Sequence, residues 1–319
     1  MPGRGRRVTL GPVSLEPSPE LKMHADEIHT DAALVRRLLA RQFPDWAALP
    51  VRRVQSFGTD NALYRLGDDL VARLPRIGWA VGQVEKELEW LPKLAPQLPL
   101  HLPQPLALGQ PGEGYPFTWG VYRWLPGQML SLSEMTARPR LARQLAEFVL
   151  ALRECDMTDA PRAERPANGL RELDPHVQAA IQASAGLLDA ATREGIVAVW
   201  DEAMQLSDWT AAPVWVHGDL HSNNLLWDGE RLIAALDFSA LELNDPAIDL
   251  MPAWNALSAE GRRIYREALQ PDAATWARGR ARALAKAMFA LPYYRDTNPE
   301  IVERSWYTVR EVSADRRDR

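Results

Sequence analysis

The first patterned stretch of the chain carries apolar side chains at helical spacing. Thr30 or Asp31 can cap the start of this stretch, and Pro44 ends it because proline cannot continue a helix. The spacing predicts a helix over residues 31–43, whose apolar face consists of Leu34, Val35, Leu38, Leu39 and Phe43.

Short apolar runs separated by turn residues follow this helix. Residues 51–57, 62–66 and 70–74 predict three antiparallel strands, with Gly67-Asp68 as the turn before the third. A second helix is predicted over about 80–95, with a face made of Val81, Val84, Leu88, Leu91 and Leu94. Two more extended runs cover residues 104–108 and 117–125.

The pattern changes after Pro126-Gly127 and becomes mainly helical. Apolar positions over 141–152 predict one helix, and two more are expected within 174–208, after a proline-rich link. A β-type run at 214–216 and a hairpin over 224–238 interrupt the helices, which resume beyond Asp245. We therefore expect two units, a smaller one at 23–125 and a larger one at 126–319, which on the interpretation given below would bind a nucleotide and an acceptor substrate respectively.

Residues 1–22 show no period and are rich in Pro, Gly and Arg, which predicts a disordered tail. Met23 directly precedes the first patterned segment and is an alternative start to Met1. The basic N-terminus lacks the apolar core of a secretory signal.

Composition narrows the class of protein. The chain has 319 residues, of which 46% are hydrophobic and 25% charged, as in globular proteins with a real core. The net charge of −5 argues against a nucleic-acid partner, and no apolar run is long enough for a membrane span. The single cysteine, Cys155, fits a reducing, cytoplasmic setting, and we expect it to be a buried hydrophobe. No pattern indicates an oligomeric state.

Polar side chains that can carry chemistry gather in residues 216–228, which read VHGDLHSNNLLWD. His217, Asp219 and His221 stand at alternate positions, and one interpretation is a metal-dependent hydrolase. Zinc sites need three or more protein ligands, yet the chain has only 6 His and none follows residue 221. This interpretation is short of ligands.

A second interpretation is phosphoryl transfer. The spacing from Asp219 to Asn224 equals that of the kinase catalytic loop HRDxxxxN, and His217 precedes the aspartate by two. Asp237 follows on the returning strand of the predicted hairpin. A carboxylate and an amide oxygen are hard ligands of the kind that Mg²⁺ prefers. The order of base, amide and carboxylate therefore favours phosphoryl transfer over hydrolysis.

The residues HGDLHSNNLL, LDF and NDPAIDL between 217 and 250 resemble the aminoglycoside phosphotransferase family, small-molecule kinases with a protein-kinase-like fold. The resemblance extends from about residue 24 to the late 290s and implies an α+β, two-lobed fold. It implies an N-lobe with a small antiparallel sheet and one long helix, and a mainly helical C-lobe. It also implies that Asp219 is the catalytic base, that Asn224 and Asp237 hold Mg²⁺, and that His217 and Asp249 support the loop.

In this family a basic residue on the third strand pairs with a glutamate on the next helix to hold phosphates. Arg73 stands where a lysine is usual, and Glu87 is its expected partner, with Glu85 and Glu89 as alternatives. Arginine keeps the charge, although its planar fork is less compact than an ammonium. Whether Arg73 replaces the lysine fully stays open.

Three further residues are expected near the nucleotide. Ser56 and Thr59, in a loop with one glycine, can contact phosphate together with backbone N–H groups. The backbone around Trp124, at the junction of the two halves, is expected by resemblance to face adenine. Gly218 stands where protein kinases have an arginine that grips an activation-loop phosphate, so we expect an enzyme that needs no such activation.

The expected activity is transfer of the γ-phosphate of ATP, or of GTP, to a hydroxyl of a small molecule, with an aminoglycoside-like or macrolide-like antibiotic favoured. Kinases of sugars, choline-like compounds or amino alcohols are the alternative, as is a catalytically silent nucleotide-binding protein. A polycationic antibiotic needs carboxylates, here expected from Glu134, Glu147, Asp156, Asp159 or Glu164. A macrolide needs an apolar pocket. The aromatic candidates for it are Trp254, Trp276, Tyr293, Tyr294 and Trp306, although their helical spacing favours a place in the core for most of them.

Overall fold

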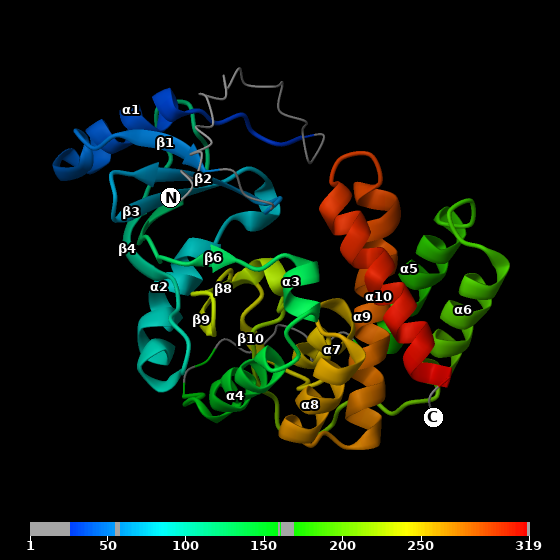
Figure 1. Ribbon diagram of the computed structural model, residues 1–319. Coiled ribbons are helices and arrows are strands. Elements are labelled where there is room, and N and C mark those ends of the chain that lie inside the picture. The colour runs from blue at the N-terminus through cyan, green and yellow to red at the C-terminus, as the bar shows by residue number, and fades with distance from the viewer. Residues whose placement is uncertain (1–25, 55–57, 159, 161–168, 318–319) are drawn as a thin grey trace, which may run out of the picture.

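A computed structural model describes residues 26–54, 58–158, 160 and 169–317. The expected tail and Met23 lie outside the described residues, as do Ser56 and the proline-rich link at 161–168. Figure 1 shows a sheet-containing N-terminal part and a larger helical part below and beside it. The two-lobed α+β architecture expected from the sequence is confirmed.

The N-terminal part is a five-stranded antiparallel sheet in the order β1-β2-β3-β5-β4. Alternate residues of the second strand, Ala62, Tyr64 and Leu66, are buried, as the period of a half-buried strand requires. The first helix lies beside the sheet, and Asp31 rather than Thr30 caps it. The elements are α1 (Ala32–Gln42), β1 (Val51–Val54), β2 (Asn61–Leu66), β3 (Leu70–Pro75), β4 (Gln104–Gly109) and β5 (Trp119–Arg123).

The long helix of this part, α2 (Gln83–Leu94), begins later than the sequence predicted. The prediction that Val81 lies on the apolar face of this helix is wrong, because Val81 precedes the helix and is 44% exposed. Gly82, with a φ of +88°, stands at the N-cap, so the chain turns there before the helix can start. The buried face carries one charged residue, Glu87, among Val84, Leu91 and Leu94.

The second half of α2 belongs to the hydrophobic core of the C-lobe. Trp90, Leu91 and Leu94 pack in one cluster with the C-terminal helices, and the indole of Trp90 lies 5.1 Å from that of Trp215 between ring centroids. The sheet has a separate core under α1. The long helix therefore anchors the small lobe on the large one, and the change in sequence pattern at Pro126 does not coincide with the limit of a hydrophobic core.

The C-lobe is helical, as predicted. The apolar residues at helical spacing on α4 are buried, which packs this helix into the centre of the lobe: Leu141, Leu145, Phe148, Val149 and Leu152. The helices are α3 (Leu132–Thr136), α4 (Leu141–Glu154), α5 (Leu170–Ala183), α6 (Ala190–Met204), α7 (Pro252–Asn255), α8 (Ala259–Leu269), α9 (Ala273–Tyr294) and α10 (Pro299–Arg317).

Short strands carry the central motif between these helices. The predicted hairpin forms from β8 (Leu225–Trp227) and β9 (Leu232–Ala235), to which β6 (Gln128–Met129) adds an edge. The strand before the motif, β7 (Val214–Val216), pairs with β10 (Glu242–Asn244), which the sequence pattern did not predict. This second pairing brings the chain after Asp237 back beside the motif.

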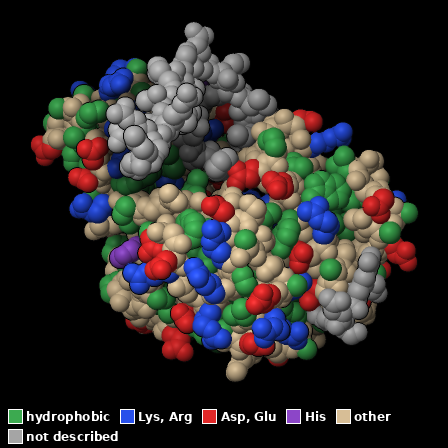
Figure 2. All heavy atoms as spheres, in the orientation of Figure 1, with side chains coloured by type: hydrophobic (Ala, Val, Ile, Leu, Met, Phe, Trp, Pro, Cys, Tyr) green, Lys and Arg blue, Asp and Glu red, His purple; other side chains and the backbone are tan. Residues whose placement is uncertain are grey.

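The surface and the cysteine agree with the composition. Figure 2 shows Lys and Arg interspersed with Asp and Glu over the helical face, without a continuous basic area on that face among the residues described. Cys155 is buried, and burial raises the pKa of its thiol, which is the expected behaviour of a small hydrophobe. Within the described ranges no helix has the length and apolarity to cross a membrane.

Candidate active site

The central loop is held from below by one buried carboxylate. Asp249, on a 3₁₀ turn before α7, accepts hydrogen bonds from the backbone N–H groups of His217 (2.7 Å) and Gly218 (3.0 Å). Burial raises the pKa of Asp249, while the two N–H groups and His217 favour the ionised form. Asp249 thus lies where the resemblance expected an anchor.

Gly218 is required by the shape of the loop. Its φ is +85°, and a Cβ at this position would lie 2.5 Å from the carbonyl oxygen of Ala240. The absence of the protein-kinase arginine here therefore has a local steric reason, since any side chain would collide with the chain that follows β9.

His217 connects the loop to the strand that returns beside it. Its Nε2 lies 3.0 Å from the carbonyl oxygen of Leu236, and its Nδ1 accepts the backbone N–H of Asp219 at 3.3 Å. The ring packs on Phe238, with 4.5 Å between centroids, and is fully buried. Both ring nitrogens are used in bracing the backbone, so this histidine is not placed to bind a metal.

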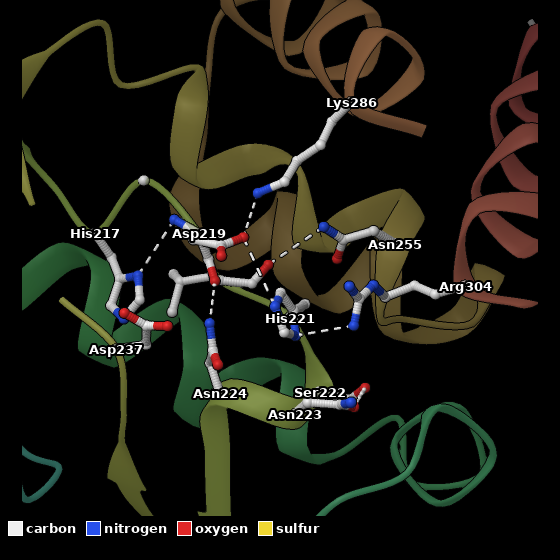
Figure 3. A network of polar contacts seen from close by, with 12 residues as sticks. His217, Asp219, His221, Ser222, Asn223, Asn224, Asp237, Asn255, Lys286 and Arg304 are labelled. Carbon is white, nitrogen blue, oxygen red and sulfur yellow. Dashed lines mark hydrogen bonds and ion pairs between the residues drawn. The ribbon is translucent and has the colours of Figure 1, made fainter. Parts of the chain in front are cut away.

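Asp219 emerges from this frame into a cavity, with its side chain 27% exposed. Figure 3 shows Lys286 reaching its carboxylate from α9 and His221 lying beneath it. His221 Nε2 is 3.7 Å from Asp219 Oδ1. Burial alone raises the pKa of Asp219, but Lys286 and His221 outweigh burial and lower it well below its ordinary value. The group is therefore ionised at neutral pH.

His221, for which the sequence suggested no chemical role, is buried and has a polar contact at each ring nitrogen. Arg304, on α10, places Nη1 3.3 Å from its Nδ1, while Nε2 faces Asp219. Burial, together with the charge of Arg304, lowers the pKa of His221 to about 4. A neutral imidazole that accepts from Arg304 and donates toward Asp219 fits both contacts, and it leaves no ring nitrogen for a metal.

Asn224 and Asp237 lie on the other side of Asp219. The Asn224 amide nitrogen donates to the backbone carbonyl of Asp219 at 2.9 Å, which leaves its amide oxygen as the free acceptor. Asp237 follows β9 with a φ of +59°, an uncommon left-handed conformation that turns the chain beside the loop. The two oxygen donors and Asp219 line the same cavity.

Arg73 and Glu87 form a buried ion pair across β3 and α2. Arg73 Nη1 lies 2.7 Å from Glu87 Oε1, and Nη2 lies 3.3 Å from Asp237 Oδ1. The Tyr122 hydroxyl donates to the second oxygen of Glu87 at 2.6 Å. Burial opposes the charge of Arg73, but Glu87 and Asp237 raise its pKa above the ordinary value. Of the three glutamates considered, Glu87 is the partner.

A lysine not singled out in the sequence holds α2 in this position. Lys86 Nζ donates to the backbone carbonyl of Ser239 and to that of Leu241, the latter at 3.2 Å. Both carbonyls belong to the chain just after Asp237-Phe238. Adjacent residues of α2 therefore fix the helix on the two sides of the site: Glu87 to the sheet and Lys86 to the C-lobe.

Arg73, Asn224 and Asp237 line one cavity of about 560 Å³ together with Asp219. Thr59 and Trp124 also line it, at the end nearest the sheet. Thr59 accepts a hydrogen bond from the Tyr294 hydroxyl of α9 at 3.4 Å, which links the two lobes. The backbone N–H of Trp124 donates to the backbone carbonyl of Asp69 at 2.7 Å, and the Arg65 guanidinium stacks 3.9 Å from the centre of the Trp124 ring. That N–H is thus occupied within the protein.

Most of the residues considered for acceptor binding do not line the cavity. Glu134 caps α3, and neither it nor Glu147 or Asp156 lines the cavity; Asp159 and Glu164 lie outside the described residues. Trp254 and Trp276 pack on each other in the core, 4.6 Å apart. Of the five aromatic candidates, Tyr294 lines the cavity.

Sequence reasoning missed Lys286, Arg304 and Lys86, and one signal was available for the lysines. The chain contains lysine only at positions 22, 86, 93 and 286, and uses arginine for its other long cations. Lysine is a compact charge with three rotating donors, whereas arginine is a planar fork. Two of these rare lysines contact the site.

The cavity lies between the two lobes, with the ionised carboxylate of Asp219 and the oxygen donors of Asn224 and Asp237 on one side and the paired Arg73 on the other. The chain belongs to the phosphotransferase enzyme family, whose model matches residues 51–284. This confirms the resemblance to the aminoglycoside phosphotransferases and the class of enzyme. No curated protein matches the chain.

Solved structures share the fold at low identity. Aminoglycoside 2'-phosphotransferase-IIIa, as the GDP complex of an F108L mutant, aligns with a TM-score of 0.72 and 21% identity over 89% of this chain and 98% of that one. The GDP and kanamycin complex of APH(2")-IIIa gives 0.69 and 20% over 88% and 98%. Macrolide 2'-phosphotransferase MphH from Brachybacterium faecium gives 0.55 and 19% over 87% and 97%.

Proposed function

We propose that this enzyme transfers the γ-phosphate of ATP to a hydroxyl group of a small molecule. The observation that carries this proposal is the meeting of Asp219, Asn224, Asp237 and Arg73 in one cavity. Phosphoryl transfer needs a positioned acceptor, metal-binding oxygens and fixed positive charge, and little covalent chemistry from the protein. These four side chains supply each of those parts.

The residues present fit Mg²⁺. The Asp237 carboxylate and the Asn224 amide oxygen are hard donors that face one cavity, and the Asn224 amide is oriented by its bond to Asp219. Mg²⁺ is commonly held by one or two side-chain oxygens, with phosphate and water completing the shell. When bound, the ion would neutralise charge on the transferred phosphoryl group.

The chain's own residues account for the transfer. Asp219 orients the acceptor hydroxyl and takes up its proton as the acceptor oxygen bonds to the γ-phosphorus. The bond from that phosphorus to the β–γ bridging oxygen breaks, and ADP leaves with the electron pair. Arg73, braced by Glu87, neutralises the upstream phosphates. A strongly ionised Asp219 is a weak base, so its main contribution is to orient the hydroxyl.

We assign nucleotide binding mainly to residues 23–125, with Ser56, Thr59 and Trp124 near the phosphates and the base, and acceptor binding to 126–319. ATP is the proposed donor, and GTP is an alternative, because three of the neighbours carry GDP while one carries ADP and one carries ATP. Because the backbone N–H of Trp124 is already bonded to Asp69, an adenine would form its hydrogen bonds with the backbone of the residues next to Trp124 in the chain. The cytoplasm supplies both ATP and Mg²⁺ and is the proposed compartment.

We propose that the enzyme needs no activating phosphorylation. The Arg73–Glu87 pair is formed, and Lys86 ties α2 to the chain after Asp237. Gly218 removes the side chain that would bind an activation-loop phosphate. The parts that regulated kinases assemble on activation are thus already assembled here.

The acceptor is a small-molecule alcohol. Kanamycin, gentamicin and a macrolide appear in the names of the neighbours, which supports an antibiotic, whereas a metabolite such as a sugar or an amino alcohol is the alternative. At these identities the likeness shows the fold alone, so the class of acceptor has to be inferred from the charges in the cavity.

The test is a transfer assay with ATP or GTP and Mg²⁺ on wild-type protein, Asp219→Ala and an exposed-residue control, Asp201→Ala. Wild type and control should phosphorylate an alcohol, and Asp219→Ala should bind nucleotide with turnover lower by a factor on the order of 10². Nucleotide binding without transfer or hydrolysis in wild type would favour the silent alternative. Full activity of Asp219→Ala would reject its role.

A further inference from the structure

The wall of the cavity beside Asp219 carries two cations from the C-terminal helices. Lys286 comes from α9 and Arg304 from α10, and Figure 3 shows both directed toward the loop around Asp219 and His221. Among the described residues that line the cavity, the carboxylates are Asp60, Asp219 and Asp237. The last two are engaged in chemistry and metal binding, and Asp60 belongs to the loop before β2.

Arg304 has no carboxylate of its own. Its contact in this region is with the neutral imidazole of His221 at 3.3 Å, and within the described part of the chain it forms no ion pair. A guanidinium has five donors and binds carboxylate or phosphate through two of them. Burial lowers the pKa of Arg304, while the more distant charges of Asp219 and Glu300 oppose this effect. The local field therefore favours a bound anion.

Lys286 is paired, but with the group that the reaction uses. Its ammonium contacts Asp219, and its side chain is 45% exposed to the cavity. An ammonium has three donors, so the same group can hold Asp219 and a second acceptor atom. His221 lies between Asp219 and Arg304, and the two cations line the same cavity as the proposed base.

We propose that the acceptor alcohol carries an anionic group, a carboxylate or a phosphate, which binds between Lys286 and Arg304 while its hydroxyl meets Asp219. This proposal rests on the proposed function and names the acceptor class for the same site. A polycationic aminoglycoside would place ammonium groups against both cations, and the cavity offers it no spare carboxylate on this side. Ala287, Ala290 and Ile301 complete the wall and suit a short carbon skeleton.

The experiment compares acceptors that differ in charge and share their hydroxyl groups. Gluconate is paired with glucitol, glycerol 3-phosphate with glycerol, and kanamycin serves as the polycation. Transfer from Mg²⁺–ATP is measured as kcat/KM, and binding as the thermal shift of protein loaded with Mg²⁺ and a non-hydrolysable ATP analogue. At least one anion should exceed its neutral twin about tenfold, and the pair in which this occurs distinguishes carboxylate from phosphate.

Variants assign the preference to its residues. Arg304→Gln should lower the ratio of anionic to neutral acceptor about tenfold, mainly through KM for the anion, and Arg304→Lys should restore part of it. Lys286→Gln should reduce the same ratio. Arg310→Gln, at an exposed position of the same helix, should leave it unchanged. A purely structural role for Arg304 would lower the thermal stability and both acceptors alike.

The outcomes separate this inference from the proposed function. Transfer to glucitol, glycerol or kanamycin in preference to both anions would leave a small-molecule kinase and overturn the anionic acceptor. If neither anion exceeds its neutral twin in transfer or in thermal shift, the inference is also overturned. Failure to bind Mg²⁺–ATP would instead reject the proposed function itself.

Discussion

The two ends of the cavity solve their charge balance in opposite ways. At the phosphate end, Arg73 is neutralised within the protein by Glu87 and Asp237, and the Tyr122 hydroxyl completes the network. At the end beside Asp219, Lys286 is paired with the Asp219 carboxylate, while Arg304 contacts the imidazole of His221 and forms no ion pair among the described residues. One end is built and satisfied in advance, and the other keeps a surplus of positive charge.

Under the proposed function, the paired end serves the nucleotide and the reaction, and the end with surplus positive charge selects the acceptor. A buried charge is costly unless it is paired, so the paired network at the phosphate end stays fixed whatever acceptor is bound. An unpaired cation is tolerated where a ligand of opposite charge completes it. Substitutions at the two ends should therefore differ in kind: those at the paired end should act on turnover and nucleotide binding, and those at the other end on the choice of acceptor.

Asp219→Asn and Asp237→Asn should each lower turnover by a factor on the order of 10² or more, for different reasons. Loss of Asp219 removes orientation of the hydroxyl and should leave nucleotide affinity unchanged. Loss of Asp237 removes a metal ligand and should abolish the part of nucleotide affinity that depends on Mg²⁺. Calorimetric titrations with and without Mg²⁺ check this, and identical binding profiles for the two variants would contradict the assignment.

Gly218→Ala should destabilise the protein by about 3 kcal/mol, because the new Cβ meets the Ala240 carbonyl and the φ is positive. The matched control is Gly229→Ala, whose φ is +105° with nothing within 4 Å of the added carbon. It should lose only about 1 kcal/mol from backbone strain. Urea unfolding measures both, and equal losses would show that the contact under the loop is not the constraint.

Lys86→Met should raise KM for ATP several-fold, since α2 loses its tie to the chain after Asp237 and holds Glu87 against Arg73 less firmly. The ammonium is half-buried, and burial lowers its pKa. Lys93→Met, on an exposed turn of the same helix, is the control. An unchanged KM for both variants would mean that the sheet alone positions α2.

His221→Gln should reduce, by about 1 kcal/mol, the loss in free energy of unfolding that the protein suffers as the pH falls from 7 to 4.5. The folded-state pKa of His221 is lowered from 6.5 to about 4, so the unfolded chain takes up the proton first as the pH falls. Its contribution is present above pH 6.5 and is lost as the pH falls toward 4.

The measurement for His221→Gln is urea unfolding at pH 7 and at pH 4.5, where the variant should lose less stability than wild type. His176→Gln, at an exposed position of α5, should follow wild type. Equal losses in all three proteins would show that His221 is not buried as a neutral imidazole.

How far the sequence predicted the site depended on how local each part is. Asp219, Asn224 and Asp237 lie within one motif and its hairpin, and a fixed spacing along a hairpin brings residues together. The Arg73–Glu87 pair was expected by resemblance, although Glu85 and Glu89 stayed open because one turn of helix decides which of them faces the sheet. Val81 was wrongly placed in the helix because Gly82, in a left-handed conformation, is the N-cap, so the helix begins only after it.

Lys286 and Arg304 were out of reach of such reasoning. They stand on helices 67 residues and 83 residues away from their contacts at Asp219 and His221. Neither has a local pattern that distinguishes it from a surface cation, apart from the rarity of lysine. The carboxylates expected around a polycation were misplaced for the same reason, since composition does not say which face of a helix a charge occupies.

The class of fold, the order of the sheet and helical parts, and the motif with the proposed catalytic residues could all be predicted from the sequence. Those features follow from periodicity and short spacings, which act over a few residues. The tertiary structure places Lys286 and Arg304 in the cavity wall, joins α2 to the C-lobe core, and leaves Gly218 no room for a side chain. Each of these depends on how distant segments pack, and packing is a property of the whole folded chain.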